Sequence, residues 1–195
     1  NLTRRDNSFV YESPSFGGLK LSAMVSLGEQ NKLNSESEMS NKYGNSYAAQ
    51  AVYRKGAFGI GFTYTYQNLA AEAPNNLKDP NAHAALYNLG ASYDFGFTKP
   101  SIQFEYKNGN DQPWSQDFFL IQIGTSTPLL GGRLGTTAAY YKNQTLSKAD
   151  AYSFGIRYDY SLSKRTMLYA GTVALIQEAN AQFSIEDGPD SSFHY

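Results

Sequence analysis

Large apolar residues recur at every second position along most of this chain. In the stretch FGIGFTYTYQN (58–68), Phe58, Ile60, Phe62 and Tyr64 alternate with glycine and threonine. A period of two predicts an extended strand whose two faces differ in polarity. The pattern predicts about ten strands, at 8–14, 19–28, 47–55, 58–68, 87–95, 101–107, 118–124, 132–141, 152–160 and 166–175. No helical period of comparable length occurs, so the expected class is all-β.

Short and long connections between these strands alternate without exception. Tight turns are expected at 13–18, 54–57, 95–100, 127–132 and 161–166. Long polar connections are expected at 28–46, 69–84, 107–116, 142–151 and 176–192. In an up-and-down meander this places every tight turn on one rim and every long loop on the other, an asymmetry typical of transmembrane barrels. A soluble sandwich gives no reason for such a segregation.

Composition narrows the function classes. The 195-residue chain has 16 Lys and Arg against 17 Asp and Glu, so its near-neutral charge gives no sign of a nucleic-acid partner. It has no cysteine and only two histidines, His83 and His194, which are far apart, so neither a metal site nor a catalytic nucleophile is predicted. No apolar run approaches the length of a membrane-spanning helix, whereas barrel strands conceal their hydrophobicity by alternation.

The aromatic face is predicted to contact lipid and the polar face water. A closed sheet of ten or more strands encloses a lumen too wide to be filled by one layer of side chains. Tyrosines and phenylalanines also gather near strand ends, as at Tyr64, Tyr93, Phe95 and Tyr158. An aromatic ring with a polar tip suits the headgroup level of a bilayer. The expected fold is therefore a transmembrane antiparallel up-and-down β-barrel.

Two segments resemble a known family. RRDNSFVYESPSFGGLKLSAMVS (4–26) resembles the segment that follows the constriction loop in Gram-negative general porins of the neisserial and Burkholderiales type. YDYSLSKRTMLYA (158–170) resembles a late strand, periplasmic turn and strand of the same family. The resemblance implies a water-filled pore in the outer membrane and a homotrimer of 16-stranded barrels.

About ten strands are predicted here rather than sixteen. Relative to the family, the first strands, the inward-folded third loop and the closing strand have no counterpart. We therefore expect residues 1–195 to form a single β-barrel domain that is the portion of a longer porin following the constriction loop. A ten-stranded barrel is the alternative, since even strand numbers from eight upward occur.

The candidate pore-lining groups are charged residues at the alternate strand positions that carry polar side chains. Parity selects Glu12, Lys20, Arg54, Asp94, Glu105, Lys107, Arg157 and Asp159, together with Arg133. Arg4 joins them if the first strand extends that far, and the resemblance places it in a basic cluster that faces the third loop. Such charges can select solutes by sign, or they can merely wet the lumen and pair with one another.

The expected function is passive diffusion of small hydrophilic solutes and ions, with a weak preference for anions and no cofactor. Expected partners are outer-membrane lipid, lipopolysaccharide and two further copies of the chain. A rival hypothesis is a substrate-specific channel, which lumen tyrosines such as Tyr141 would favour. Two further hypotheses are an outer-membrane enzyme and a soluble β-barrel binding protein.

Overall fold

The computed structural model describes residues 7–27, 44–68, 71–73, 77–79, 82–109, 116–181 and 183. Ten antiparallel strands form one sheet in the order β1-β2-β3-β4-β7-β8-β9-β10-β11-β12. Their bounds are β1 Ser8–Glu12, β2 Leu19–Ser26, β3 Ser46–Lys55, β4 Phe58–Asn68, β7 His83–Tyr93, β8 Lys99–Gly109, β9 Phe118–Leu129, β10 Gly132–Asn143, β11 Ala151–Ser161 and β12 Met167–Gln177. Each strand pairs with its neighbours in sequence, which confirms the predicted up-and-down meander.

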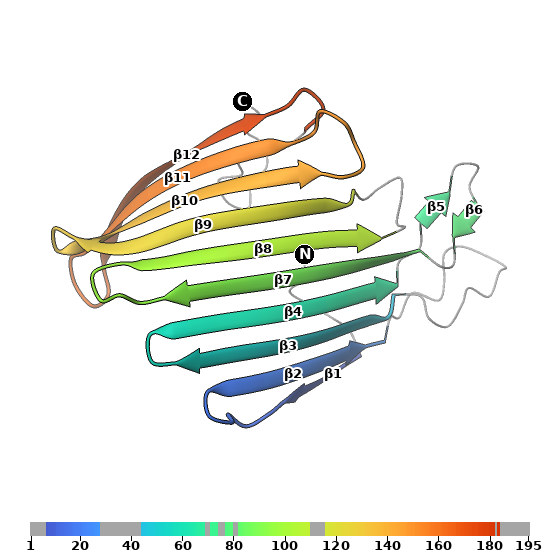
Figure 1. Ribbon diagram of the computed structural model, residues 1–195, viewed down its shortest axis with the longest axis horizontal. Helices are drawn as coiled ribbons and strands as arrows, with labels where there is room; N and C mark the ends of the chain where they lie inside the picture. Colours follow the sequence, from blue (N-terminus) through green and yellow to red (C-terminus); the bar gives the residue numbers. More distant parts are fainter. Residues whose placement is uncertain are drawn as a thin grey trace.

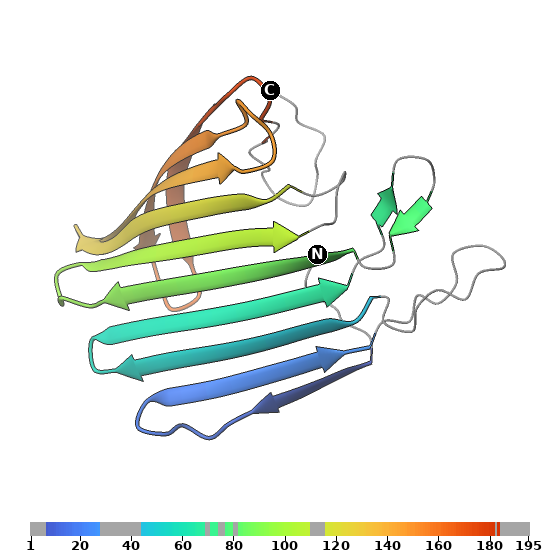
Figure 2. The ribbon, with the colours of Figure 1, turned by 45° about the vertical axis from the view of Figure 1, so that its right-hand side comes forward.

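The sheet is a single layer that curves along the order of its strands. Figure 1 shows β1 to β9 as a broad wall, and in Figure 2 β10 to β12 turn away from it, so that one face is hollow. The strands β1 and β12 form the two edges of the sheet. The structure therefore has the curvature of a barrel wall.

The two rims of this wall differ as predicted. Tight turns join β1 to β2, β3 to β4, β7 to β8, β9 to β10 and β11 to β12, and all of them lie on the left-hand rim of Figure 1. The β3–β4 turn contains only residues 56–57, and the β9–β10 turn only residues 130–131. The strand ends that the longer connections join lie on the opposite rim. The segregation of loops by length is therefore confirmed.

One long connection contains structure that alternation did not predict. β5 Ala71–Ala73 and β6 Leu77–Asp79 form a separate two-stranded antiparallel sheet between β4 and β7. Three residues are too few to show a period of two, which explains why the sequence predicts only a polar loop here. The small sheet pairs backbone groups that a long loop must otherwise leave to water.

The wall has no hydrophobic core of the usual kind. The buried apolar side chains among the described residues are all alanines, and the largest fully buried side chain is Ser46. Large apolar side chains instead remain exposed, most of them on one face of the sheet; Phe62 is 42% exposed and Ile123 is 55% exposed. The described residues contain no helix long and apolar enough to cross a membrane.

The convex face carries an apolar band between two belts of aromatic rings. Near the rim of long connections, Tyr64 packs on Tyr87, and Tyr87 on Tyr106, with ring centroids 5.0 and 5.9 Å apart. Near the rim of tight turns, Tyr93 packs on Phe95 at 4.6 Å. Paired aromatic belts on either side of an apolar band are the outer surface of a membrane barrel.

Hydroxyl groups on the convex face are paired with one another. Thr125 and Thr136 lie directly opposite on β9 and β10, and their hydroxyl oxygens are 2.8 Å apart. Thr98 and Thr127 make a second such bond of 2.8 Å. A polar group without water must find a partner in the protein, so this pairing suits a surface that faces lipid.

Candidate functional site

The concave face of the wall is the candidate functional site. Its first feature is Arg54, which lies near the end of β3 and beside the β1–β2 turn. The Arg54 amide donates a 2.9 Å hydrogen bond to the carbonyl of Gly18. Gly18 has a φ of +99°, and an added Cβ would collide with the Arg54 carbonyl oxygen. Glycine is therefore required at this position, where the turn fixes the backbone that carries the guanidinium.

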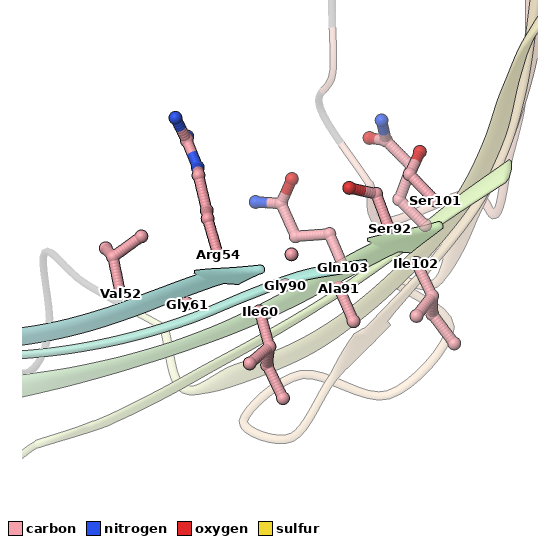
Figure 3. Close-up of a pocket in the computed structure, with 12 residues that line it drawn as sticks. Val52, Arg54, Ile60, Gly61, Gly90, Ala91, Ser92, Ser101, Ile102 and Gln103 are labelled. Atoms are coloured by element: carbon pink, nitrogen blue, oxygen red, sulfur yellow. The ribbon is translucent and has the colours of Figure 1, made fainter. Parts of the chain in front are cut away.

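A shallow groove of about 310 Å³ runs across the wall below Arg54. Gly59, Gly61 and Gly90 form its floor, because they expose backbone where other residues would project. In Figure 3, Arg54, Ser92 and Gln103 extend from the concave face, whereas Ile60 and Ile102 extend from the convex face. The alternate positions that carry polar residues therefore lie on the hollow side of the sheet, as predicted.

The register of the strands extends this assignment to the other charged residues. On the concave face, strand residues of the described part include six cations, Lys20, Arg54, Lys99, Lys107, Arg133 and Arg157. They also include three anions, Glu12, Glu105 and Asp159. This face is thus more basic than the chain as a whole. A narrow passage along it would attract anions, since low-dielectric walls concentrate the field of fixed charges.

Two of these charges neutralise each other. Arg157 donates a 2.6 Å hydrogen bond from Nε to Asp159, two residues further along β11. The Arg157 guanidinium also lies 4.5 Å from the ring centre of Tyr169 on β12. By contrast, the Arg54 guanidinium makes no ion pair within the described residues and extends into open space (Figure 3). Arg54 is therefore the stronger candidate for contact with a solute.

Three positions complete the comparison with the sequence predictions. Asp94 lies in the tight turn after β7, where its carboxylate accepts a 2.8 Å bond from the Gly96 amide. Arg4 lies outside the described residues. Lys99 was missed because the sequence assigned it to a turn, whereas β8 begins at Lys99. Counting the alternation of β8 back by two residues from Ser101 would have identified it.

The polar groups of this face are dispersed, a geometry that suits reversible contact with a solute. These groups are spread over many strands, and the groove is open along its length. Within the described part of the chain, no three metal-ligating side chains gather. Dispersed charges and amides can exchange hydrogen bonds with a passing hydrated solute without holding it.

Comparison with known proteins agrees with this geometry. A family model described as Gram-negative porin matches residues 1–178. The chain belongs to the Gram-negative porin family. Its location is accordingly the bacterial outer membrane. A search of curated proteins finds no match.

Solved porins share the fold. The anion-selective porin from Comamonas acidovorans superposes with a TM-score of 0.75 at 23% identity, over 89% of this chain and 50% of that one. A porin refined at 1.8 Å resolution superposes with a TM-score of 0.64 at 17% identity, over 89% of this chain and 58% of the other. This porin chain therefore spans about half the length of the solved porins that it matches.

Proposed function

We propose that this chain forms the wall of a water-filled pore through which small hydrophilic solutes and ions diffuse passively. The observation that carries the proposal is the division of one curved sheet into a convex face with aromatic belts and a concave face with dispersed charges. Family membership supports the same function. A pore in lipid requires that the edges β1 and β12 be paired within a closed wall, because unpaired backbone groups are too costly in hydrocarbon.

We further propose that the pore prefers anions weakly. The excess of concave cations supports this preference, and one solved relative is itself named an anion-selective porin. The pore-lining groups proposed are Glu12, Lys20, Arg54, Lys99, Glu105, Lys107, Arg133, Arg157 and Asp159. Arg4 and Asp94 remain proposed members of the same group. Among them, Arg54 contributes most, because it borders the groove and makes no ion pair within the described residues.

Reversal potentials across a salt gradient test this proposal. Protein from outer membranes, reconstituted in planar bilayers, should show a reversal potential with the sign of anion preference. The substitution Arg54→Glu should move that potential toward cation preference. The preference should also fade as salt rises, because the Debye length falls from about 10 Å at 0.1 M to about 3 Å at 1 M.

Lys55→Glu is the matched control, since it reverses the same charge on the adjacent residue of β3, which lies on the convex face opposite Phe58. Its shift should be smaller than that of Arg54→Glu. Clear cation preference in the unsubstituted protein would contradict a basic pore, and equal shifts from the two variants would contradict the role assigned to Arg54. Absence of any conductance would contradict the pore itself.

We also propose that the chain assembles as a homotrimer. Its support is a group of small residues on the convex face, where Ala23 lies directly opposite Ala49 and the exposed Ala49 is followed on the same face by Ala51. Small side chains allow two walls to approach closely in place of lipid. Light scattering of detergent-extracted protein should give a trimer, and Ala49→Arg should reduce the assembled fraction. A monomer under mild extraction would contradict this proposal.

A further inference from the structure

The concave face is not polar throughout. Toward the rim of long connections, β9 to β12 carry an apolar group that we call the aromatic patch, comprising Phe118, Leu120, Tyr141, Leu175 and Phe183. Register places Leu120 and Tyr141 opposite each other, and Leu175 opposite Ser153 on the same face. The patch therefore faces the same hollow as Arg54.

Three rings of the patch are packed in series. The ring centres of Phe118 and Tyr141 are 5.1 Å apart. Those of Tyr141 and Phe183 are 4.8 Å apart and meet edge to face at 73°. Both arrangements are favourable for aromatic side chains. The third ring comes from the segment after β12, which here folds against the concave face.

Hydrogen bonds hold this segment in place. The Phe183 amide donates a 2.9 Å bond to the side-chain oxygen of Gln177, the last residue of β12. Before it, the Asn180 amide and side chain bond the carbonyls of Lys148 and Ser147 at 2.8 and 2.7 Å. These bonds at Asn180 and Phe183 hold the described part of the segment beside Tyr141.

The patch surrounds an open cavity of about 300 Å³. An apolar cavity of about 150 Å³ is sufficient for benzene in a protein interior, so a substituted ring fits here. Phe183 remains 39% exposed beside this cavity. The structure thus provides both space for a ring and aromatic surface against which the ring can stack.

Charged groups of both signs lie beside the aromatic patch on β8, the strand next to β9. Lys107 lies directly opposite Phe118, and Glu105 lies directly opposite Leu120. Directly opposed residues have Cβ atoms about 4.5–5.5 Å apart. A solute whose ring lies in the patch would therefore have its polar end near Glu105 and Lys107, which are two residues apart on the same face of β8.

We propose that the aromatic patch is a binding subsite for small zwitterionic solutes that carry an aromatic ring, of the α-amino acid class. The ring stacks on Tyr141 and Phe183, the ammonium group faces Glu105, and the carboxylate faces Lys107. This subsite rests on the proposed pore, and it would slow the passage of such solutes relative to those without a ring.

Block of the ionic current tests the subsite. Phenylalanine added to the reconstituted protein should reduce the open-channel current at a concentration about tenfold below that required for alanine, which has the same charges and no ring. Phe183→Ser should raise the half-blocking concentration of phenylalanine about three- to tenfold. Leu146→Ser is the control, since Leu146 is an exposed apolar residue on the same rim outside the patch; it should change nothing.

The charged end is tested separately. Glu105→Gln should weaken block by phenylalanine and leave block by phenylacetate, which lacks the ammonium group, unweakened.

Equal block by phenylalanine and alanine in the unsubstituted protein would overturn the subsite, and this is also the result expected if another segment of the chain fills the cavity. An unchanged response in Phe183→Ser would overturn it too. If open channels are recorded with either of these two results, the proposed pore is still supported. If no channels are recorded, the pore and the subsite are overturned together.

Discussion

Phe62 and Thr63 are neighbours on β4 whose side chains meet different solvents. Phe62 is 42% exposed on the convex face between Ala51 and Leu89. Thr63 accepts a 3.2 Å hydrogen bond from the Gln50 side chain on the concave face. The polarity of each environment, rather than the extent of burial, therefore decides which substitutions these positions tolerate.

Arginine at the two positions should have opposite consequences. Phe62→Arg should lower the free energy of unfolding by about 2–4 kcal/mol, because it places a charge near the middle of the lipid-facing band. Thr63→Arg should fold normally and alter conductance, because its charge projects into water. Urea titration of refolding into lipid vesicles measures the free energy of unfolding of both variants. If Phe62→Arg is as stable as Thr63→Arg, the two faces have been assigned the wrong way round.

Parity in the sequence was enough to place individual charges on a face, but not to pair them. Lys20, Arg54, Glu105 and Lys107 occupy the face that alternation predicts. The bond between Arg157 and Asp159 depends on side-chain rotamers and on the nearby ring of Tyr169, which alternation does not encode. Which cations remain available to a solute could therefore be learned only from the structure.

At the scale of elements, Asp150 ties the β10–β11 connection to its neighbours. Its carboxylate accepts bonds from the Tyr140 hydroxyl at 2.8 Å and the Asn143 amide at 3.0 Å, and it lies 3.4 Å from Lys142 Nζ. The Asp150 amide in turn donates a 3.0 Å bond to Glu178, beyond β12. Burial alone would raise the pKa of Asp150, but the bonds from Tyr140, Asn143 and Lys142 together hold it below its ordinary value.

A lowered pKa means that the folded connection prefers the charged carboxylate. Its stabilising contribution is fully present above the ordinary aspartate pKa of about 3.9 and is lost as the pH falls through the lowered value. The Asn143 amide resonance should titrate with a midpoint below that ordinary value in an NMR experiment. Asp150→Asn should abolish this titration and speed amide exchange in the connection at pH 7. A midpoint at or above the ordinary value would show that the carboxylate bonds do not stabilise the fold.

Elements with clear alternation were predictable, whereas elements without it were not. β4, β8 and β11 have large apolar residues on one face only, β7 departs from this pattern only at Leu86, and the structure contains each of these strands. β12 has Val173 and Leu175 on the concave face as well, so its sequence gave only weak alternation and no warning of the aromatic patch. The sequence signals for the patch were Tyr141 and the apolar Phe118 and Leu120 at polar positions of 118–124, whereas the approach of Phe183 depends on contacts after β12.

At the scale of the whole molecule, the proposed pore depends on which face of one curved sheet meets water. The absence of cysteine from the chain makes this directly measurable, because each introduced cysteine is then the only thiol. Along β4, positions 61, 63 and 65 lie on the concave face, and positions 60, 62 and 64 on the convex face.

Single cysteines at these six positions should be exposed to a charged, membrane-impermeant thiol reagent while current through the reconstituted protein is recorded. We expect a stepwise change in conductance for Gly61→Cys, Thr63→Cys and Thr65→Cys, and none for Ile60→Cys, Phe62→Cys and Tyr64→Cys. A conductance change for the cysteines at positions 60, 62 and 64, with none for those at 61, 63 and 65, would contradict a water-lined concave face. Equal responses at all six positions would contradict it too.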